Sequence, residues 1–296
     1  MPTFEEHRSL LTGVAYRILG SIADAEDVVQ EAWLRWANVD ETSVEDAKAY
    51  LVRVTSRLAI DRLRWAKSRR ESYVGPWLPE PVSTAPDVAE HAELADSVEL
   101  ALLVVLETLS PLERAVFVLR EAFDMPFSEI GEIIGRAEPA TRQLARRARE
   151  HVREKRPRFD VDRAERRRIT ERFIDAAAGG DLDELIELFA GEVTMVSDGG
   201  GKARAALRII TGAENVSRYL QSINSPANIA RFMVSIGMAG ISDLSFGVAV
   251  LNNAPAMIIS AGGRVITVVS LLIVDGRIDT VYLIANPEKI AHLTPA

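Results

Sequence analysis

The stretch Ser128–Arg153, SEIGEIIGRAEPATRQLARRAREHVR, is the most specific part of this 296-residue sequence. Ser128 is a candidate helix cap, Gly135 ends the first short helical segment, and a second, arginine-rich segment follows Glu138. A short helix, a glycine turn and a second helix form the helix-turn-helix motif, whose second helix enters the DNA major groove. The alternative is a solvated basic helix in a bundle, but the cap and the turn favour DNA binding.

The N-terminal residues of such a second helix meet base edges, and its later arginines suit phosphates. The candidate DNA-binding residues of this second helix are Thr141, Arg142, Gln143, Arg146, Arg147 and Arg149. A second basic segment, residues 53–70, lies in a chain whose net charge is −8, so two separate polyanion contacts are expected.

Helical spacing of apolar residues extends over most of the first half of the chain. It predicts helices over about 10–20, 24–37, 43–67, 94–109, 111–123 and 139–155. Residues 71–92 interrupt this pattern with four prolines and a glycine, so they predict a linker. Trp77 and Leu78 lie within it, although a fully solvated linker would not need them.

The sequence after residue 160 has a different character. We expect helices over about 163–178, 181–189 and 210–223, followed by strands rich in Val and Ile. The expected strand segments are FMVSIGMA (232–239), SFGVAVLN (245–252), PAMIISA (255–261), RVITVVSLLIV (264–274) and RIDTVYLIA (277–285). Helices followed by an antiparallel sheet predict an α+β domain.

Composition limits the remaining classes of function. The chain has no cysteine, and its four histidines are scattered, so neither a thiolate site nor a metal site nor a cofactor is expected. No apolar run is long enough to span a membrane, and the N-terminus carries acidic residues where a secretory signal is basic. We therefore expect a cytoplasmic protein that does not contact a membrane.

Two further segments carry a family resemblance. SIADAEDVVQEAWLRW (21–36) and AYLVRVTSRLAIDRLR (49–64) resemble region 2 of the extracytoplasmic-function (ECF) sigma factors, a helical bundle. SPLERAVFVLRE (110–121), followed by the helix-turn-helix, resembles region 4, which reads the −35 promoter element. The candidate DNA-binding residues of the second helix are therefore the expected −35 residues. The resemblance implies a factor that binds core RNA polymerase, through the β′ clamp helices and the β flap, and promoter DNA.

The resemblance also implies site residues. The expected polymerase-binding residues are Asp24, Glu26, Asp27, Gln30 and Glu31. Region 2 reads the −10 promoter element, and the residues expected to contact it are Arg53, Arg57, Asp61, Arg62, Arg64 and Trp65. For Trp65 both base stacking and core packing stay open. Because Gln143 and Leu144 replace residues that are common in the family, the promoter sequence does not transfer.

The tail resembles the SnoaL-like (NTF2-like) cone that is fused to sigma factors of the SigJ-like subgroup. The expected domains are region 2 (1–70), a linker (71–92), region 4 (93–158) and the cone (160–296). The subgroup's motifs are WLPEP, DGGGK and NPxK, and they imply a regulatory contact that needs no separate anti-sigma factor. The matching residues are Trp77, Leu78, Pro79, Glu80, Pro81, Asp198, Gly199, Gly200, Gly201, Lys202, Asn286, Pro287 and Lys289.

Three alternatives accompany this interpretation. DGGGK fits a phosphate loop poorly, because Ala203 follows Lys202 and no glycine precedes it at the required spacing. An enzyme is disfavoured, because the predicted strands carry almost no ionisable inward residue, although a cone can hold a small-molecule ligand. A repressor or activator with a ligand-sensing domain leaves the acidic helix unexplained. We expect DGGGK to face the linker, with Trp77 and Leu78 over it.

Overall fold

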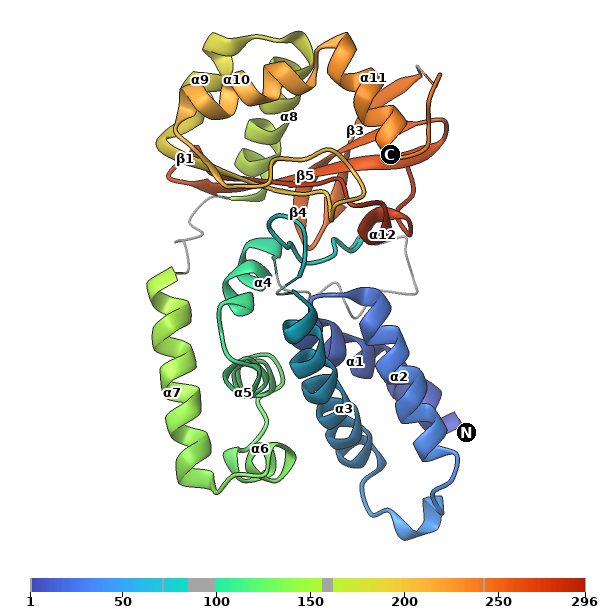
Figure 1. The fold of residues 1–296 in the computed structure, drawn as a ribbon. Helices are drawn as coiled ribbons and strands as arrows, with labels where there is room; N and C mark the ends of the chain where they lie inside the picture. The colour runs from blue at the N-terminus through green and yellow to red at the C-terminus, as the bar shows by residue number, and fades with distance from the viewer. Residues whose placement is uncertain (1, 71, 85–98, 156–161, 242, 296) are drawn as a thin grey trace. The chain divides into compact units, whose positions relative to one another are not determined.

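The computed structural model describes residues 2–70, 72–84, 99–155, 162–241 and 243–295. The chain divides into two compact units, which are described one at a time (Figure 1). Unit 1 contains residues 1–71 and 86–156, and unit 2 contains residues 72–85 and 157–296. The linker residues 72–84 therefore pack with the C-terminal part of the chain.

Unit 1 is helical. Its elements are α1 (Pro2–Leu19), α2 (Ile22–Trp36), the short 3₁₀ helix η1 (Glu41–Ser43), α3 (Ala47–Arg70), α4 (Leu100–Glu107), α5 (Pro111–Glu121), α6 (Phe127–Ile134) and α7 (Glu138–Lys155). Helices α1, α2 and α3 pack on one another, and α5 packs on α7. Both α1 and α3 also contact α5, so the two helical groups share one unit.

Local sequence explains where these helices begin. The Ser21 hydroxyl accepts the Asp24 amide 3.1 Å away and caps α2. Ser110 and Glu113 form a capping box at the start of α5. The predicted Ser128 cap is wrong, because α6 already begins at Phe127 and its N-cap is Pro126. Residues 94–98 of the predicted helix 94–109 lie outside the described residues.

Unit 2 combines helices with one sheet. Its elements are α8 (Arg163–Gly179), α9 (Leu182–Leu188), β1 (Phe189–Asp198), β2 (Ile210–Thr211), α10 (Ala213–Ile223), α11 (Pro226–Ser235), β3 (Leu244–Leu251), β4 (Ala254–Ala261), β5 (Arg264–Val274), β6 (Arg277–Ile284) and α12 (Pro287–Ile290). The strand order is β2-β1-β6-β5-β4-β3. Strands β3 to β6 form an antiparallel meander.

Two sequence predictions for unit 2 are wrong in detail. The sheet is mixed rather than antiparallel, because the last strand of the meander, β6, returns beside β1 in the same direction. The segment 232–239 is not a strand, since residues up to Ser235 belong to α11. Pro226 in the first turn and the helical spacing of Ile229, Phe232 and Met233 explain this helix.

Helices α8, α9 and α10 cover one face of the sheet (Figure 1). The core of unit 2 is formed by buried side chains of these helices and of the sheet. Phe173 from α8 and Phe189 from β1 meet in it with ring centroids 6.3 Å apart. The described chain therefore consists of two helical groups and an α+β domain, as the predicted fold class requires.

The linker lies along the edge strand β3. Ser83 forms an isolated antiparallel bridge with Leu251, and the Thr84 amide donates to the Val250 carbonyl over 3.1 Å. The Asn252 amide donates to the Val82 carbonyl over 2.9 Å. Main-chain pairing thus fixes one end of the linker to the sheet, and the other end reaches the site described next.

Candidate promoter-binding surfaces and linker-binding site

The helix-turn-helix is held by two glycines. Gly135 has the left-handed φ of 67° and ends α6. Gly131 allows the chain to fold closely, because a Cβ there would stand 2.6 Å from the Arg136 carbonyl oxygen. Thr141 is fully buried at this turn, and its hydroxyl donates to the Ala137 carbonyl over 3.2 Å. This position disfavours a direct base contact by Thr141.

The other candidate −35 residues line the exposed side of α7. Each arginine has a glutamate partner: Arg142 with Glu138, Arg146 with Glu150, Arg147 with Glu113, and Arg149 with Glu121. These exposed pairs are weak, so phosphates and base edges can replace the glutamates.

Region 2 brings two predicted sites together. Arg62, assigned to −10 binding, lies 2.7 Å from the Asp24 carboxylate and 3.1 Å from that of Asp27, both assigned to polymerase binding. Its guanidinium also lies 5.1 Å from the ring centroid of Trp65, which is 49% exposed. Core packing of Trp65 is therefore wrong. Trp36 is buried, whereas Trp33 is only half-buried.

The remaining candidates of region 2 differ in what they contact. Glu26, Asp27, Gln30 and Glu31 are exposed on α2, as expected for a docking face. Arg64 pairs with Asp61 on its own helix at 2.8 Å. Arg53 and Arg57, by contrast, both reach Glu132 of α6. Two candidate −10 residues are thus engaged by the helix-turn-helix.

A buried charge network also joins the two helical groups. Glu107 of α4 pairs with Arg70 of α3 and with Arg114 of α5. Arg114 is fully buried and donates to the Arg17 carbonyl over 3.2 Å. Lys67 donates to the Glu107 carbonyl over 3.2 Å, and burial lowers its pKa. Sequence analysis missed this network, since its members are far apart in sequence.

Asp198 forms the centre of the linker-binding site in unit 2. Its carboxylate is fully buried and accepts three hydrogen bonds. The donors are the Tyr73 hydroxyl at 2.6 Å, the Leu78 amide at 2.8 Å and the Lys289 ammonium at 2.7 Å. A buried carboxylate needs hydrogen-bond donors to compensate for its lost hydration, and the linker backbone supplies one of them.

Lys289 completes the site from α12. Its side chain is buried, donates to the Leu78 carbonyl as well as to Asp198, and lies 3.8 Å from the ring centroid of Trp77. Asp198 and Lys289 therefore bind both the amide and the carbonyl of Leu78. A cation held against an aromatic face and a carboxylate is a strong contact when it is desolvated.

Tyr73 and Asn286 form a second layer of the site. The Asn286 amide donates to the Tyr73 hydroxyl over 2.9 Å, and its side-chain oxygen caps α12. Burial, together with the Asp198 carboxylate, raises the pKa of Tyr73 well above its usual range. The hydroxyl therefore stays protonated and donates. Tyr73 was not predicted, although it precedes the proline segment directly.

Gly200 and Gly201 let the linker approach the loop. Both have left-handed φ angles, 59° and 72°. A Cβ on Gly200 would lie 2.4 Å from the Asn286 side-chain nitrogen and 2.9 Å from the Tyr73 oxygen, and one on Gly201 would lie 3.1 Å from Val74. Gly199 faces its own loop instead, since a Cβ there would meet the Ala203 carbonyl oxygen at 2.3 Å.

The other candidates have supporting contacts. Lys202 pairs with Glu288 at the surface, and Pro287 is the first residue of α12. Pro79, Glu80 and Pro81 are buried. His292 bonds to the Pro81 carbonyl at 2.8 Å, and the Asn252 side chain accepts the Val82 amide at 3.1 Å. Sequence reasoning did not assign these last two residues to the linker.

No group of three or more His, Cys, Asp or Glu side chains among the described residues could hold a metal ion. None of the described helices is long and apolar enough to cross a membrane.

Comparison with known families matches both helical groups. Residues 3–69 match Sigma-70 region 2, and residues 99–152 match Sigma-70, region 4. The chain is 38% identical over 294 residues to the ECF RNA polymerase sigma factor SigJ of Mycobacterium tuberculosis, covering 97% of this chain and 91% of the relative. It is 35% identical to the probable ECF RNA polymerase sigma factor SigI of the same species, covering 97% and 93%.

The similarity extends to a solved structure. The crystal structure of the M. tuberculosis extracytoplasmic function sigma factor SigJ aligns with a TM-score of 0.76 at 34% identity. The alignment covers 97% of this chain and 96% of that one, so it includes the C-terminal α+β domain as well as both helical groups.

Proposed function

The chain belongs to the ECF RNA polymerase sigma factors, and on this premise we propose that its C-terminal domain controls transcription by binding the linker between regions 2 and 4. As a member of the family it binds core RNA polymerase and promoter DNA and directs transcription initiation, and it is not an enzyme. The proposal concerns what the additional domain does to that activity.

One observation carries the proposal: a buried ion pair of the C-terminal domain binds the backbone of the linker. Asp198 and Lys289 are both buried, and between them they bind the amide and the carbonyl of Leu78. A buried pair is costly to desolvate unless further hydrogen bonds satisfy it. Here the linker supplies those bonds, so the bound linker is strongly preferred over an empty site.

Linker length gives this contact a consequence. Elements centred near −10 and −35 lie about 25 base pairs apart, or roughly 85 Å of B-DNA. The predicted linker, 71–92, has 22 residues and can reach about 75 Å when it is free. With residues 72–84 bound, only the eight residues 85–92 remain free, about 27 Å, and the bound stretch adds no more than its fixed span. Binding of residues 72–84 therefore restricts the separation of regions 2 and 4. Release shifts the population toward the extended form that promoters require.

Contacts within unit 1 support a compact resting form. Arg53 and Arg57 contact Glu132 of α6, and promoter phosphates would have to displace these contacts. The Glu107 network links α3 with α5. In this form α3 is held against α5 and α6 of the helix-turn-helix group, which suits storage of an inactive factor. The domain would then make a separate anti-sigma factor unnecessary.

The finer assignments belong to the same proposal. Asp24, Glu26, Asp27, Gln30 and Glu31 dock on the β′ clamp helices, while region 4 meets the β flap and the −35 element. The −10 element is met by Arg53, Arg57, Asp61, Arg62, Arg64 and Trp65. Charge complementarity supports the docking face, and exposed arginines with an exposed tryptophan support the DNA face. The protein would act in the cytoplasm, where core polymerase transcribes.

Truncation after Pro157 tests the proposal. Removing residues 158–296 leaves the linker without the Asp198 and Lys289 contacts, so we expect output in a run-off assay with core polymerase to change. The template carries the region upstream of the protein's own gene, and the full chain is the reference. Identical output from both proteins would exclude control by the domain, whereas no initiation by either would exclude this promoter.

Substitution of Arg146 tests the assignment of α7. Arg146→Ala should weaken promoter binding by the holoenzyme roughly tenfold or more, because a lost base contact costs about 1–3 kcal/mol. Arg167→Ala is a matched control, since Arg167 pairs with Glu171 as Arg146 pairs with Glu150, both at i,i+4. Fluorescence anisotropy with labelled promoter DNA measures both. Equal effects of the two substitutions would contradict the assignment.

A further inference from the structure

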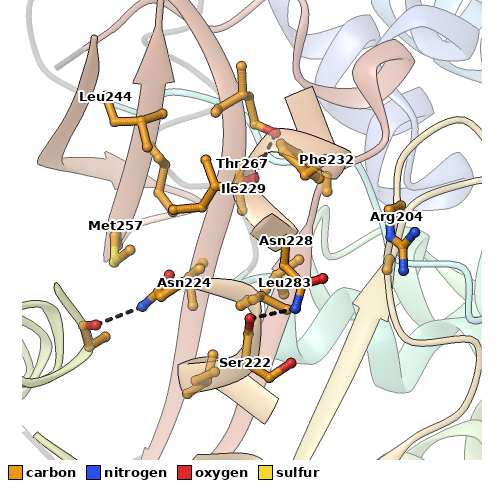
Figure 2. A pocket seen from close by; sticks show the side chains of 18 of the residues that line it. Arg204, Ser222, Asn224, Asn228, Ile229, Phe232, Leu244, Met257, Thr267 and Leu283 are labelled. Atoms are coloured by element: carbon orange, nitrogen blue, oxygen red, sulfur yellow. Dashed lines mark hydrogen bonds between the residues drawn. The ribbon is translucent and has the colours of Figure 1, made fainter. Parts of the chain in front are cut away.

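A cavity of about 270 Å³ lies in unit 2 between the helices and the inner face of the sheet (Figure 2). Its wall is mostly apolar, with Phe173, Met257 and Leu283 from α8, β4 and β6. Ile229 and Phe232 line it from α11. A cavity of this size and lining suits a small ligand of one or two rings.

The polar groups of the cavity are distributed unevenly. The side-chain amides of Asn224 and Asn228 already donate to the carbonyls of Ala177 and Ser222, as Figure 2 shows. Thr267 likewise donates to the Ile266 carbonyl. These three side chains each donate to a backbone carbonyl, so they do not call for a charged ligand.

Arg204 is the exception. Among the described residues that line the cavity it is the one charged side chain, and no carboxylate lines the cavity beside it. Arg204 is exposed, and no ion pair to it is present in the described part of the chain. An apolar cavity with a single unpaired guanidinium at its exposed edge favours a ligand that brings its own anion.

Tyr219 provides a second donor near this edge. It lines the same cavity, and burial raises the pKa of its hydroxyl, against smaller opposite effects of Ser197, the Ala206 backbone and the Arg204 charge. The hydroxyl therefore stays protonated, and both side chains belong to the lining of one cavity. Arginine and a phenol at one end suit the two oxygens of a carboxylate.

We infer that this cavity binds an apolar organic carboxylate, with its ring system against Met257, Leu283 and Phe232 and its carboxylate at Arg204. The inference does not depend on what the domain does in transcription. It requires only that Arg204 and the apolar wall act on one molecule. The lining lacks an acidic group or a histidine among the described residues, which fits binding rather than turnover.

The position of Arg204 gives binding a route to the linker, and this step rests on the proposed function. Arg204 and Ala205 line the cavity, while Asp198, Gly200 and Gly201 of the same loop contact the linker. The Gly199 carbonyl accepts the amides of Lys202 and Ala203, which makes the loop one compact turn. A carboxylate at Arg204 would therefore act on the segment that carries Asp198.

Two probes of equal ring size separate charge from apolar contact. The full chain is titrated with 2-naphthoate, a carboxylate, and with 2-acetylnaphthalene, its neutral counterpart, by isothermal calorimetry. We expect 2-naphthoate to bind about tenfold more tightly. Arg204→Gln should remove this difference, whereas Arg208→Gln, an exposed arginine of the same loop that does not line the cavity, should preserve it. Ile229→Trp should fill the cavity and abolish binding of both probes.

Three results would overturn the inference: no saturable binding of 2-naphthoate, equal affinity for the two probes, or a difference that survives Arg204→Gln. The route to the linker has its own readout. Saturating 2-naphthoate should alter run-off transcription by the full chain and not by the Arg204→Gln chain. Unchanged output despite measured binding would overturn the route alone. Because the truncation assay contains no probe, failure of the regulatory proposal remains distinguishable.

Discussion

Asp198→Asn is expected to destabilise unit 2 by about 3–5 kcal/mol, because it leaves the Lys289 ammonium buried without its anion. The substitution preserves shape, so the loss reports charge rather than volume. Hydrogen exchange of peptides from β5 and β6, the core strands of the sheet, measures the unit by itself in the full chain. Faster exchange there, with unit 1 unchanged, is the expected result.

Two companion variants make this test specific. Lys289→Met added to Asp198→Asn removes the orphaned cation and should recover much of the loss. Lys202→Met is the matched surface control, since Lys202 pairs with Glu288 of the same helix α12 but is half exposed. Its effect should stay below about 1 kcal/mol. If Lys202→Met and Asp198→Asn cost the same, the buried pair does not organise the site.

Protease cleavage of the linker should rank these variants in the same order as their loss of stability. Leu78 is held through its amide by Asp198 and through its carbonyl by Lys289. In Asp198→Asn the linker loses a charged acceptor, so proteases should cut residues 72–84 faster than in the unsubstituted protein. The Lys202→Met variant should resist proteases as well as the unsubstituted protein does. This connects the stability of the site to the population in which regions 2 and 4 can separate.

The sequence allowed the helix-turn-helix to be predicted because its signals are local. Gly135 ends one helix, and the exposed arginines of α7 recur at helical spacing. The linker contact also left a local trace in DGGGK, since only glycine tolerates both the left-handed φ and the approach of Tyr73. The predicted placement of Trp77 and Leu78 over the glycines is wrong in detail. Tyr73 and Val74 lie against Gly200 and Gly201, whereas Leu78 contacts Asp198 and Trp77 contacts Lys289.

Other features depend on partners that are distant in sequence. The sequence does not reveal that Arg62 meets Asp24, or that Glu107 lies between Arg70 and Arg114. The segment 232–239 is rich in residues that favour strands, yet packing of Ile229, Phe232 and Met233 selects a helix. The parallel pairing of β1 with β6 follows from the path of the whole domain.

Gly200→Leu is expected to displace the linker, because a Cβ at Gly200 would stand 2.4 Å from the Asn286 nitrogen. That nitrogen cannot simply move away, since the Asn286 side chain both caps α12 and donates to Tyr73. Each loss of about 1.4 kcal/mol in linker binding multiplies the released population tenfold. Run-off transcription should therefore shift in the same direction as truncation after Pro157, while binding to core polymerase without DNA stays unchanged.

Gly276→Leu separates this contact from backbone strain. Gly276 has a left-handed φ of 74°, and a Cβ there would meet nothing within 4 Å. Both substitutions carry the cost of a left-handed leucine, so the difference between them reports the close approach of Tyr73 and Asn286 alone. We expect Gly276→Leu to lower stability slightly and to leave transcription unchanged. Equal transcription by the two variants would show that the loop does not position the linker, and control by the domain would then need another contact.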